Sequence, residues 1–296
     1  MPESALMLDP QTRDRMVETK VTCPFLGSLV HQNLLTVRGT PDNPLAATDE
    51  VRLLGNEGGG DLGDLLVFFA TGNHAFMRGS SGLALDAPVP AGQFSLELPG
   101  SQGSHPGHSG ILQGDPKSLA SGRLSLADFD RLASFAINGC LKRSDVGRFI
   151  AQNLRKDPNA KVAQAIVAEL LARDLARAVQ AISAKVVSMI STVGTGGDRG
   201  GNGDVEQKLT RLLGEDNLVG SAGEFGLLFA FLSNDPATKQ LDGEPALALD
   251  HVRGMFVGKE LPDGWKTWKK SRIDWVLHTT ALLISAAREY HRLATT

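Results

Sequence analysis

Apolar residues recur at steps of three and four along most of the chain, the spacing of one helix face. The longest such stretch, Lys161–Ser191, is rich in alanine and leucine. Strict alternation, which is typical of a strand, is clear only at Gln93–Leu98. The pattern therefore predicts an all-α, mainly helical protein. Further helices are predicted at Ser125–Ala136, Leu141–Leu154, Glu206–Leu213, Gly223–Leu232, Ala246–Val257 and Trp268–Leu293.

The connections between these helices bear on domain organisation. Three of them are rich in glycine or proline: Gly55–Gly63, Pro88–Gly110 and Gly194–Gly203. None is long and polar enough to require a second domain, so a single domain is predicted for residues 1–296.

Two glycine-rich stretches invite a ligand-binding interpretation that their residues do not support. Gly194–Asp204 lacks the Gly-Lys-Ser/Thr sequence of a phosphate-binding loop, and no glutamate closes a calcium-binding loop that starts at Asp198. Gly55–Asp64 likewise lacks such a pattern, and a helix is expected from Leu62. Both are interpreted as mobile surface loops.

Composition narrows the class of partners. The formal net charge is −3, so no basic surplus indicates nucleic acid, and the basic run Lys266–Arg272 is interpreted as a solvated helix start. The first 20 residues are polar, and the best apolar run, Trp275–Ala287, has 13 residues, too few to span a membrane. Two cysteines cannot form a disulfide framework. A cytoplasmic protein without nucleic-acid or membrane partners is therefore predicted; oligomeric state is left open.

Cys23 directly precedes Pro24 at the start of an apolar stretch. Proline suits the first position of a helix, because its missing N–H has no helical acceptor there. Cys23 is therefore predicted to be the N-cap, facing free amides and the positive end of the helix dipole. Both favour a thiolate over a thiol. Cys140 has no such context and is interpreted as a packed thiol.

A second candidate site lies in a loop that contains His105, His108 and Asp115. These three residues, with His74 in reserve, could bind zinc or a similar ion in a haem-free hydrolase. A His-x-x-His spacing without a cysteine pair or a His-Glu helix is a weak metal signal, and the loop is also open to interpretation as an ordinary connection or as one wall of an active-site pocket.

Three segments resemble, in order, the motifs of the haem-thiolate peroxidases, the family of fungal chloroperoxidase and the unspecific peroxygenases. The first, CPFLGSLVHQNLL, is similar to the proximal motif Cys-Pro-x-Leu-Asn-Thr/Ala-Leu-Ala-Asn-His-Gly-x-Leu, but departs from it at Gly27 and five other positions. SGILQGDPKSL resembles the distal stretch of the family, and LALDHVRGMFVGKELPDGW resembles its late helix. The helical, single-domain family fold agrees with the apolar pattern.

The resemblance implies a haem b cofactor with Cys23 as axial ligand, in a motif shared by Pro24 and Leu26. A thiolate pushes electron density into the haem and promotes cleavage of the O–O bond of a peroxide. The resemblance also implies a divalent cation, Mg²⁺ or Ca²⁺, beside a haem propionate. Gly114 and Ser118 fall at or near its family positions.

The family normally carries a glutamate where this chain has Gln113, an amide that cannot transfer a proton. Asp115, His105 and His108 are the candidate replacements in the same loop. Glu224 is a further candidate, either as a buried acid that lines the pocket or as an ordinary helix-start glutamate. His31 is interpreted as a packing histidine with satisfied nitrogens.

The predicted function is a peroxidase or peroxygenase that uses hydrogen peroxide to oxidise a small organic substrate. Because Gln113 replaces the acid, the alternative is a haem-thiolate binding or sensor protein with attenuated peroxide chemistry.

Overall fold

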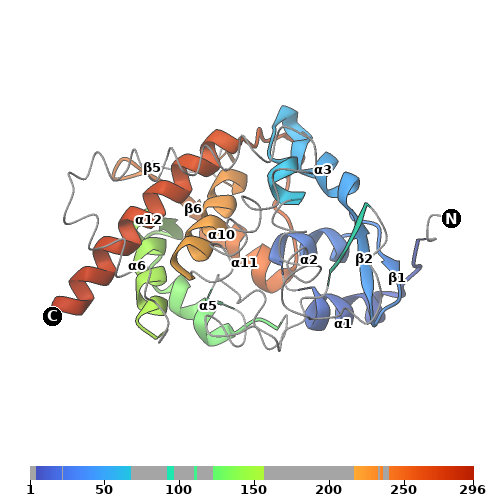
Figure 1. Cartoon of the computed structure of the whole chain (residues 1–296), viewed down its shortest axis with the longest axis horizontal. Helices are drawn as coiled ribbons and strands as arrows, with labels where there is room; N and C mark the ends of the chain where they lie inside the picture. Colours follow the sequence, from blue (N-terminus) through green and yellow to red (C-terminus); the bar gives the residue numbers. More distant parts are fainter. Residues whose placement is uncertain are drawn as a thin grey trace, which may run out of the picture.

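A computed structural model describes residues 5–21, 23–67, 92–96, 110–111, 123–156, 217–232, 234–235 and 240–296. Helices dominate this part of the chain, as predicted (Figure 1). The predicted helices Lys161–Ser191 and Glu206–Leu213 lie outside it, as does the loop Gly194–Gly203. The α-helices are α1 (Pro10–Lys20), α2 (Pro24–His31), α3 (Thr48–Asn56), α5 (Leu126–Ala133), α6 (Arg143–Leu154), α10 (Asn217–Leu232), α11 (Leu249–Arg253) and α12 (Arg272–Thr295).

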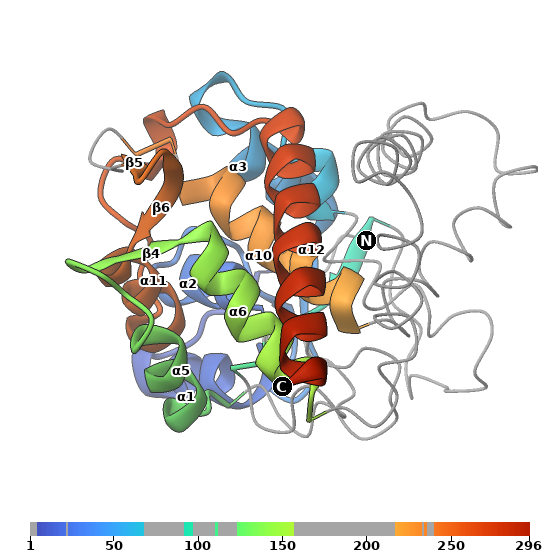
Figure 2. The ribbon, with the colours of Figure 1, turned by 90° about the vertical axis from the view of Figure 1, so that its left-hand side faces the viewer.

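Helices α6, α10 and α12 pack against one another at the C-terminal end of the molecule (Figure 2). Their ring contacts are close: Phe149 lies edge-on to Phe225 at 6.1 Å, and Phe229 stacks on the His278 ring at 5.3 Å. Gly226 of α10 faces α12, where a methyl group on the glycine would overlap Thr279 Oγ1. The small residue therefore sets how closely these two helices approach.

Two small antiparallel sheets accompany the helices. One contains β1 (Arg38–Gly39), β2 (Pro44–Ala47) and β3 (Gln93–Ser95) in that order. β3 confirms the first half of the strand predicted at Gln93–Leu98, whose last two residues lie outside the described residues. The other has the order β4 (Cys140–Lys142), β6 (Glu244–Ala248) and β5 (Gln240–Leu241).

The second sheet corrects the beginnings of two predicted helices. Leu141 is paired with Leu247 across β4 and β6, and both side chains are fully buried. The predictions Leu141–Leu154 and Ala246–Val257 therefore each begin with strand residues instead of helical ones. A short apolar run is compatible with either a strand or a helix. Here these residues form strands because each run pairs with the other, far away along the chain.

The region before α12 also differs from its prediction. α12 begins at Arg272, after Ser271 accepts a hydrogen bond from the Ile273 amide at 3.1 Å. The preceding run Lys266–Arg272 is not fully solvated, because Lys270 is completely buried. This part of the chain instead forms the short 3-10 helix η4 (Trp265–Thr267) and a tight packing contact.

The segment that packs against Trp268 and Lys270 is Gly55–Asp64. It is therefore not the surface loop predicted from its glycines. It contains the end of α3, the 3-10 helix η1 (Glu57–Gly59) and the start of a helical segment at 63–67, one residue after the helix start expected at Leu62. Gly58 has a positive φ of 78°, and a methyl group there would overlap the backbone carbonyl of Trp268. The glycine is required both for the turn and for this close approach.

The described helices and strands enclose one continuous apolar core, formed by side chains from α1 through α12. Among the described residues, no helix is both long enough and apolar enough to cross a membrane.

Candidate functional site

Cys23 is the N-cap of α2, as the sequence predicts. Its backbone is extended, with φ −72° and ψ 119°, and Pro24 takes the first helical position. The Gly27 amide donates to the Cys23 carbonyl at 2.8 Å, which starts the helical hydrogen-bond ladder. The Cys23 side chain does not cap the helix and forms no disulfide. The half-buried residue packs against the edge of the apolar core.

Helix α2 is held in place by the segment that follows α11. Ser28 Oγ donates to the Pro24 carbonyl at 2.8 Å and approaches the Met255 carbonyl at 3.4 Å. The Leu261 amide donates to Gln32 Oε1 at 3.2 Å. These contacts bridge more than 220 positions, and they bring the segment resembling the family's late helix against the one resembling its proximal motif.

An aromatic cluster lies behind the first turn of α2. The Phe25 ring contacts the Phe231 ring of α10 edge-on at 4.9 Å and the Trp265 ring at 6.3 Å. All three side chains are buried. The cluster links α2 to α10 and to the Leu-Pro-Asp-Gly-Trp turn, so it fixes the position of the helix start that carries Cys23.

Met255 belongs to a π-helical turn, η3 (Gly254–Gly258), that continues α11. The predicted helix Ala246–Val257 thus contains a strand, a short α-helix and this wider turn. Lys259 ends the turn in a left-handed conformation, with φ 57°. π-Helical turns and non-glycine residues at positive φ both occur frequently at functional sites.

The surroundings of Cys23 hold its sulfur as a thiol in the protein without bound metal. Burial raises the pKa of Cys23 to about 11, and the negative charge of Glu224 acts in the same direction. The amides of Leu26 and Phe25 and the charge of Lys259 lower it less. The amides at the helix start favour the thiolate, as predicted, but desolvation exceeds this stabilisation, so the expected thiolate does not result.

Glu224 comes from the middle of α10, which begins seven residues earlier at Asn217. The interpretation of Glu224 as a helix-start residue is therefore wrong. Its side chain is half-buried, and its charge reaches the sulfur of Cys23. The structure thus brings together two residues that the sequence selected separately, 201 positions apart.

Only the beginning of the distal stretch is described. Gly110 has a φ of 69° and lies against the Asn153 side chain of α6, where a methyl group would overlap the amide nitrogen. The carbonyl of buried Ile111 accepts from the Ser125 amide at 2.7 Å. Six candidate residues and one reserve ligand lie outside the described residues, and their roles stay predictions: His105, His108, Gln113, Gly114, Asp115, Ser118 and His74.

The structure also describes the surroundings of two further residues that were selected from the sequence, His31 and Cys140. His31 is half-buried, and its Nδ1 lies 3.0 Å from Asp14 Oδ1, so its nitrogen is satisfied by a carboxylate of α1. Cys140 is half-buried in β4 and free of any disulfide.

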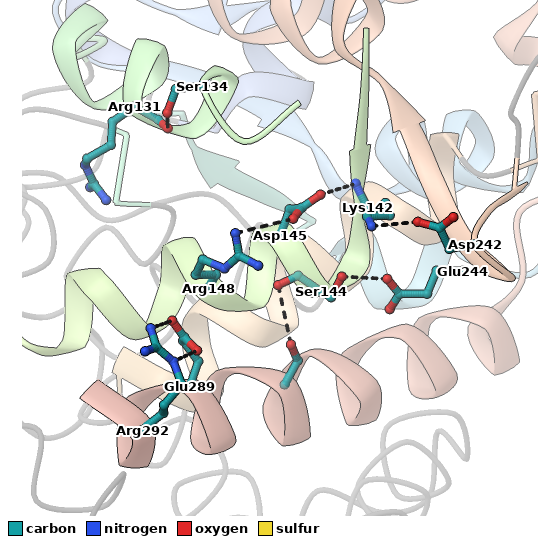
Figure 3. A network of polar contacts seen from close by, with 11 residues as sticks. Arg131, Ser134, Lys142, Ser144, Asp145, Arg148, Asp242, Glu244, Glu289 and Arg292 are labelled. Carbon is teal, nitrogen blue, oxygen red and sulfur yellow. Dashed lines mark hydrogen bonds and ion pairs between the residues drawn. The ribbon is translucent and has the colours of Figure 1, made fainter. Parts of the chain in front are cut away.

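A groove of about 430 Å³ lies between α6 and α12, away from the predicted site residues. The two carboxylates that line it have hydrogen-bond partners. Glu244 accepts from Ser144 Oγ at 2.6 Å, and both oxygens of Glu289 accept from Arg292 at 2.7 Å (Figure 3). The groove is lined by Arg143, Ser144, Arg148, Glu244, Ala281, Ile284, Ser285, Arg288 and Glu289.

Lys259 is the site residue that sequence reasoning missed. Nothing in its local sequence marks it, because its relation to Cys23 depends on the packing of η3 against α2. Within the part of the chain that the structure describes, no group of three or more His, Cys, Asp or Glu residues could hold a metal ion. A scan against protein-family models and searches of curated proteins and of solved structures found no match to the chain.

Proposed function

We propose that this chain is a haem-thiolate peroxidase or peroxygenase with a chloroperoxidase-like fold, and that Cys23 is the axial ligand of haem b. The single observation that carries the proposal is that Cys23, which forms no disulfide and begins a helix started by proline, lies close enough to the Glu224 carboxylate for its charge to raise the pKa of the thiol. Further support comes from the packing of the segment that resembles the family's late helix against the segment that resembles its proximal motif.

The residues around Cys23 fit an axial-ligand role. Its sulfur forms no disulfide, and the amides of Phe25 and Leu26 stabilise negative charge on it. A raised thiol pKa is compatible with this role, since coordination to a metal ion displaces the proton. The buried aromatic cluster around Phe25 would keep the helix start from moving when the sulfur binds.

Bound haem would supply the redox chemistry, and the protein would supply proton transfer. Glu224 is our choice for the acid/base that moves a proton between the two oxygens of hydrogen peroxide. Such a group contributes roughly 10²- to 10⁴-fold in rate. Asp115, His105 and His108 are the other candidates, because Gln113 can donate a hydrogen bond but cannot carry a proton. The substrate would be a small organic molecule.

Haem ligation can be tested by absorption of the haem-loaded, reduced protein under carbon monoxide. We expect the long-wavelength Soret band of thiolate-ligated haem, its loss in Cys23→Ala and its retention in Cys140→Ala. A band typical of histidine ligation, or one unchanged by Cys23→Ala, would reject Cys23 as the ligand. Failure of the folded protein to bind haem would reject the proposed function.

Proton transfer can be tested by the rate of peroxide consumption. We expect Glu224→Gln to lower it at least 100-fold, while Asp250→Asn, an exposed carboxylate of α11, leaves it unchanged. If Glu224→Gln has no effect, the loop acids are the acid/base groups instead.

The sensor alternative is favoured by one observation, the amide of Gln113 at the expected acid position. It predicts a loaded protein that binds ligands but consumes peroxide no faster than free haem. Gain of turnover in Gln113→Glu would then support it.

A further inference from the structure

The groove between α6 and α12 has walls of mixed chemistry. On α12 it is lined by Ala281, Ile284 and Arg288, whose spacing places them on one face of the helix. Ala281 and Ile284 are half-buried, and Arg288 is exposed. The volume of about 430 Å³ lies within the range of small-molecule sites, roughly 300–1,000 Å³. The groove can therefore hold a small organic molecule that has both an apolar and a charged part.

Both carboxylates of the groove already have hydrogen-bond donors. Glu244 accepts from Ser144 Oγ at 2.6 Å. Glu289 accepts two hydrogen bonds of 2.7 Å from Arg292, which does not line the groove (Figure 3). This second arrangement is bidentate and combines two charge-assisted hydrogen bonds. Neither carboxylate therefore needs an arginine of the groove as its donor.

The three arginines of the groove differ in how their charges are compensated. Arg148 Nη1 lies 3.9 Å from Asp145 Oδ1. Within the described part of the chain, Arg143 and Arg288 form no ion pair. Arg143 Nη1 instead lies 3.4 Å from Nδ1 of His278, which is uncharged at neutral pH because burial lowers its pKa to about 4. Two guanidinium groups therefore line the groove without a carboxylate bound to them.

We propose that this groove binds a small organic oxyanion, a carboxylate or a phosphate ester with a short apolar group, through Arg143 and Arg288. A guanidinium presents paired N–H donors that match two oxygens of either anionic group. The apolar part of the ligand would lie against Ala281 and Ile284. The groove contains no residue of the Cys23 site. The inference therefore goes beyond the proposed function and does not depend on haem.

The first experiment measures the binding of three probes to the purified chain by isothermal titration calorimetry at low ionic strength. Benzoate and phenyl phosphate carry the two oxyanions, and benzamide is a neutral counterpart of benzoate. At least one anion should bind with a Kd of about 1 mM or tighter, and benzamide at least about tenfold more weakly than that anion. The tighter anion identifies the group that the site accepts. Failure of both anions to bind at about 10 mM, or equally tight binding of benzamide, would overturn the proposal.

Charge-matched variants test whether the bound anion lies in the groove. Arg288→Met and Arg143→Met should each weaken binding of the tighter anion about tenfold. Arg155→Met removes the same charge from an exposed arginine at the end of α6, outside the groove, and should change the affinity less than about twofold. Since Arg288 is exposed, its variant decides the question even if Arg143→Met fails to fold. Equal affinities in Arg288→Met and Arg155→Met would overturn the proposal.

Two further variants test the location from other directions. Glu244→Gln removes a negative charge that acts on Arg143 and keeps an oxygen that can accept from Ser144, so it should tighten binding about twofold to fivefold. Cys23→Ala should leave the affinity unchanged, because Cys23 does not line the groove. If Glu244→Gln weakens binding, or Cys23→Ala abolishes it, the anion occupies a different site and the proposal fails. A chain that binds no haem would reject the proposed function and leave these outcomes as they are.

Discussion

Gly147 of α6 meets Ser285 of α12 so closely that a methyl group on the glycine would lie 2.6 Å from Ser285 Cβ and 3.2 Å from the Ala286 nitrogen. Ser285 Oγ in turn approaches the Ser144 carbonyl at 3.5 Å. We expect Gly147→Ala to destabilise the protein by about 1–3 kcal/mol, because the added group overfills a close helix contact. Urea unfolding followed by circular dichroism measures this loss.

The double variant Gly147→Ala/Ser285→Gly is the matched test of that explanation. It removes the Ser285 atoms that the new methyl group meets, so much of the loss from Gly147→Ala should be recovered after correction for Ser285→Gly alone. Strict additivity of the two changes would show that the destabilisation comes from elsewhere.

Lys270 is a second position where burial has a measurable consequence. Its Nζ donates to the Glu57 carbonyl at 3.0 Å and to the Trp268 carbonyl at 2.9 Å, and lies 5.1 Å from the centroid of the Trp265 ring. Lys270→Met leaves both carbonyls without this donor, and we expect a loss of about 1–3 kcal/mol at pH 7. Lys269→Met, at the exposed neighbour, should change stability by less than about 0.5 kcal/mol.

The same lysine should make stability depend on pH in the alkaline range. Burial lowers the pKa of Lys270 from 10.5 to about 8, so between these values the unfolded chain binds more protons than the folded one. The stability of the wild-type protein should therefore rise, relative to Lys270→Met, as the pH increases through this window. A difference that stays constant from pH 7.5 to 10.5 would contradict the shift; urea unfolding at several pH values measures it.

The buried His278 should make the stability of the protein depend on pH in the acid range. Burial lowers its pKa from 6.5 to about 4, and the positive charge of Arg143, whose Nη1 lies 3.4 Å from His278 Nδ1, adds to the shift. The unfolded chain binds more protons between these values, so stability is lost as the pH falls from about 6.5 towards 4. We expect a loss of about 2 kcal/mol between pH 7 and 4.5 that is absent in His278→Gln.

The control for this prediction is His291→Gln, a change near the end of α12. It should retain the acid-dependent loss of the wild-type protein. If His278→Gln and His291→Gln lose equal stability between the two pH values, then His278 is not the group responsible.

Ser125 tests a local interaction at the start of α5. Ser125 Oγ donates to Asp128 Oδ2 at 2.7 Å and accepts from the Asp128 amide at 3.4 Å. Ser125→Ala should cost about 1 kcal/mol, and Ser125→Asn, another good N-cap, should cost much less. Ser134→Ala, which removes only an exposed bond to the Arg131 carbonyl, should stay within about 0.5 kcal/mol of the wild type in thermal or urea unfolding.

The sequence by itself determined the features that depend on residues a few positions apart. The N-cap at Ser125 and the helix start at Cys23 and Pro24 are confirmed, because capping and the fixed φ of proline act within one helical turn. The mainly helical class is confirmed for the same reason: the three- and four-residue period is a local property of the chain.

Only the tertiary structure decided the features that depend on distant partners. Leu141 is a strand residue because Leu247 pairs with it, and Lys270 is buried because carbonyls and aromatic rings surround its ammonium. Cys23 followed the same rule: its helix start was predictable, but its protonation was not. Desolvation by the core outweighs the local amides, and the negative charge of Glu224, more than 200 positions away, raises the pKa further against the positive charge of Lys259. The pattern around a residue does not encode such long-range effects.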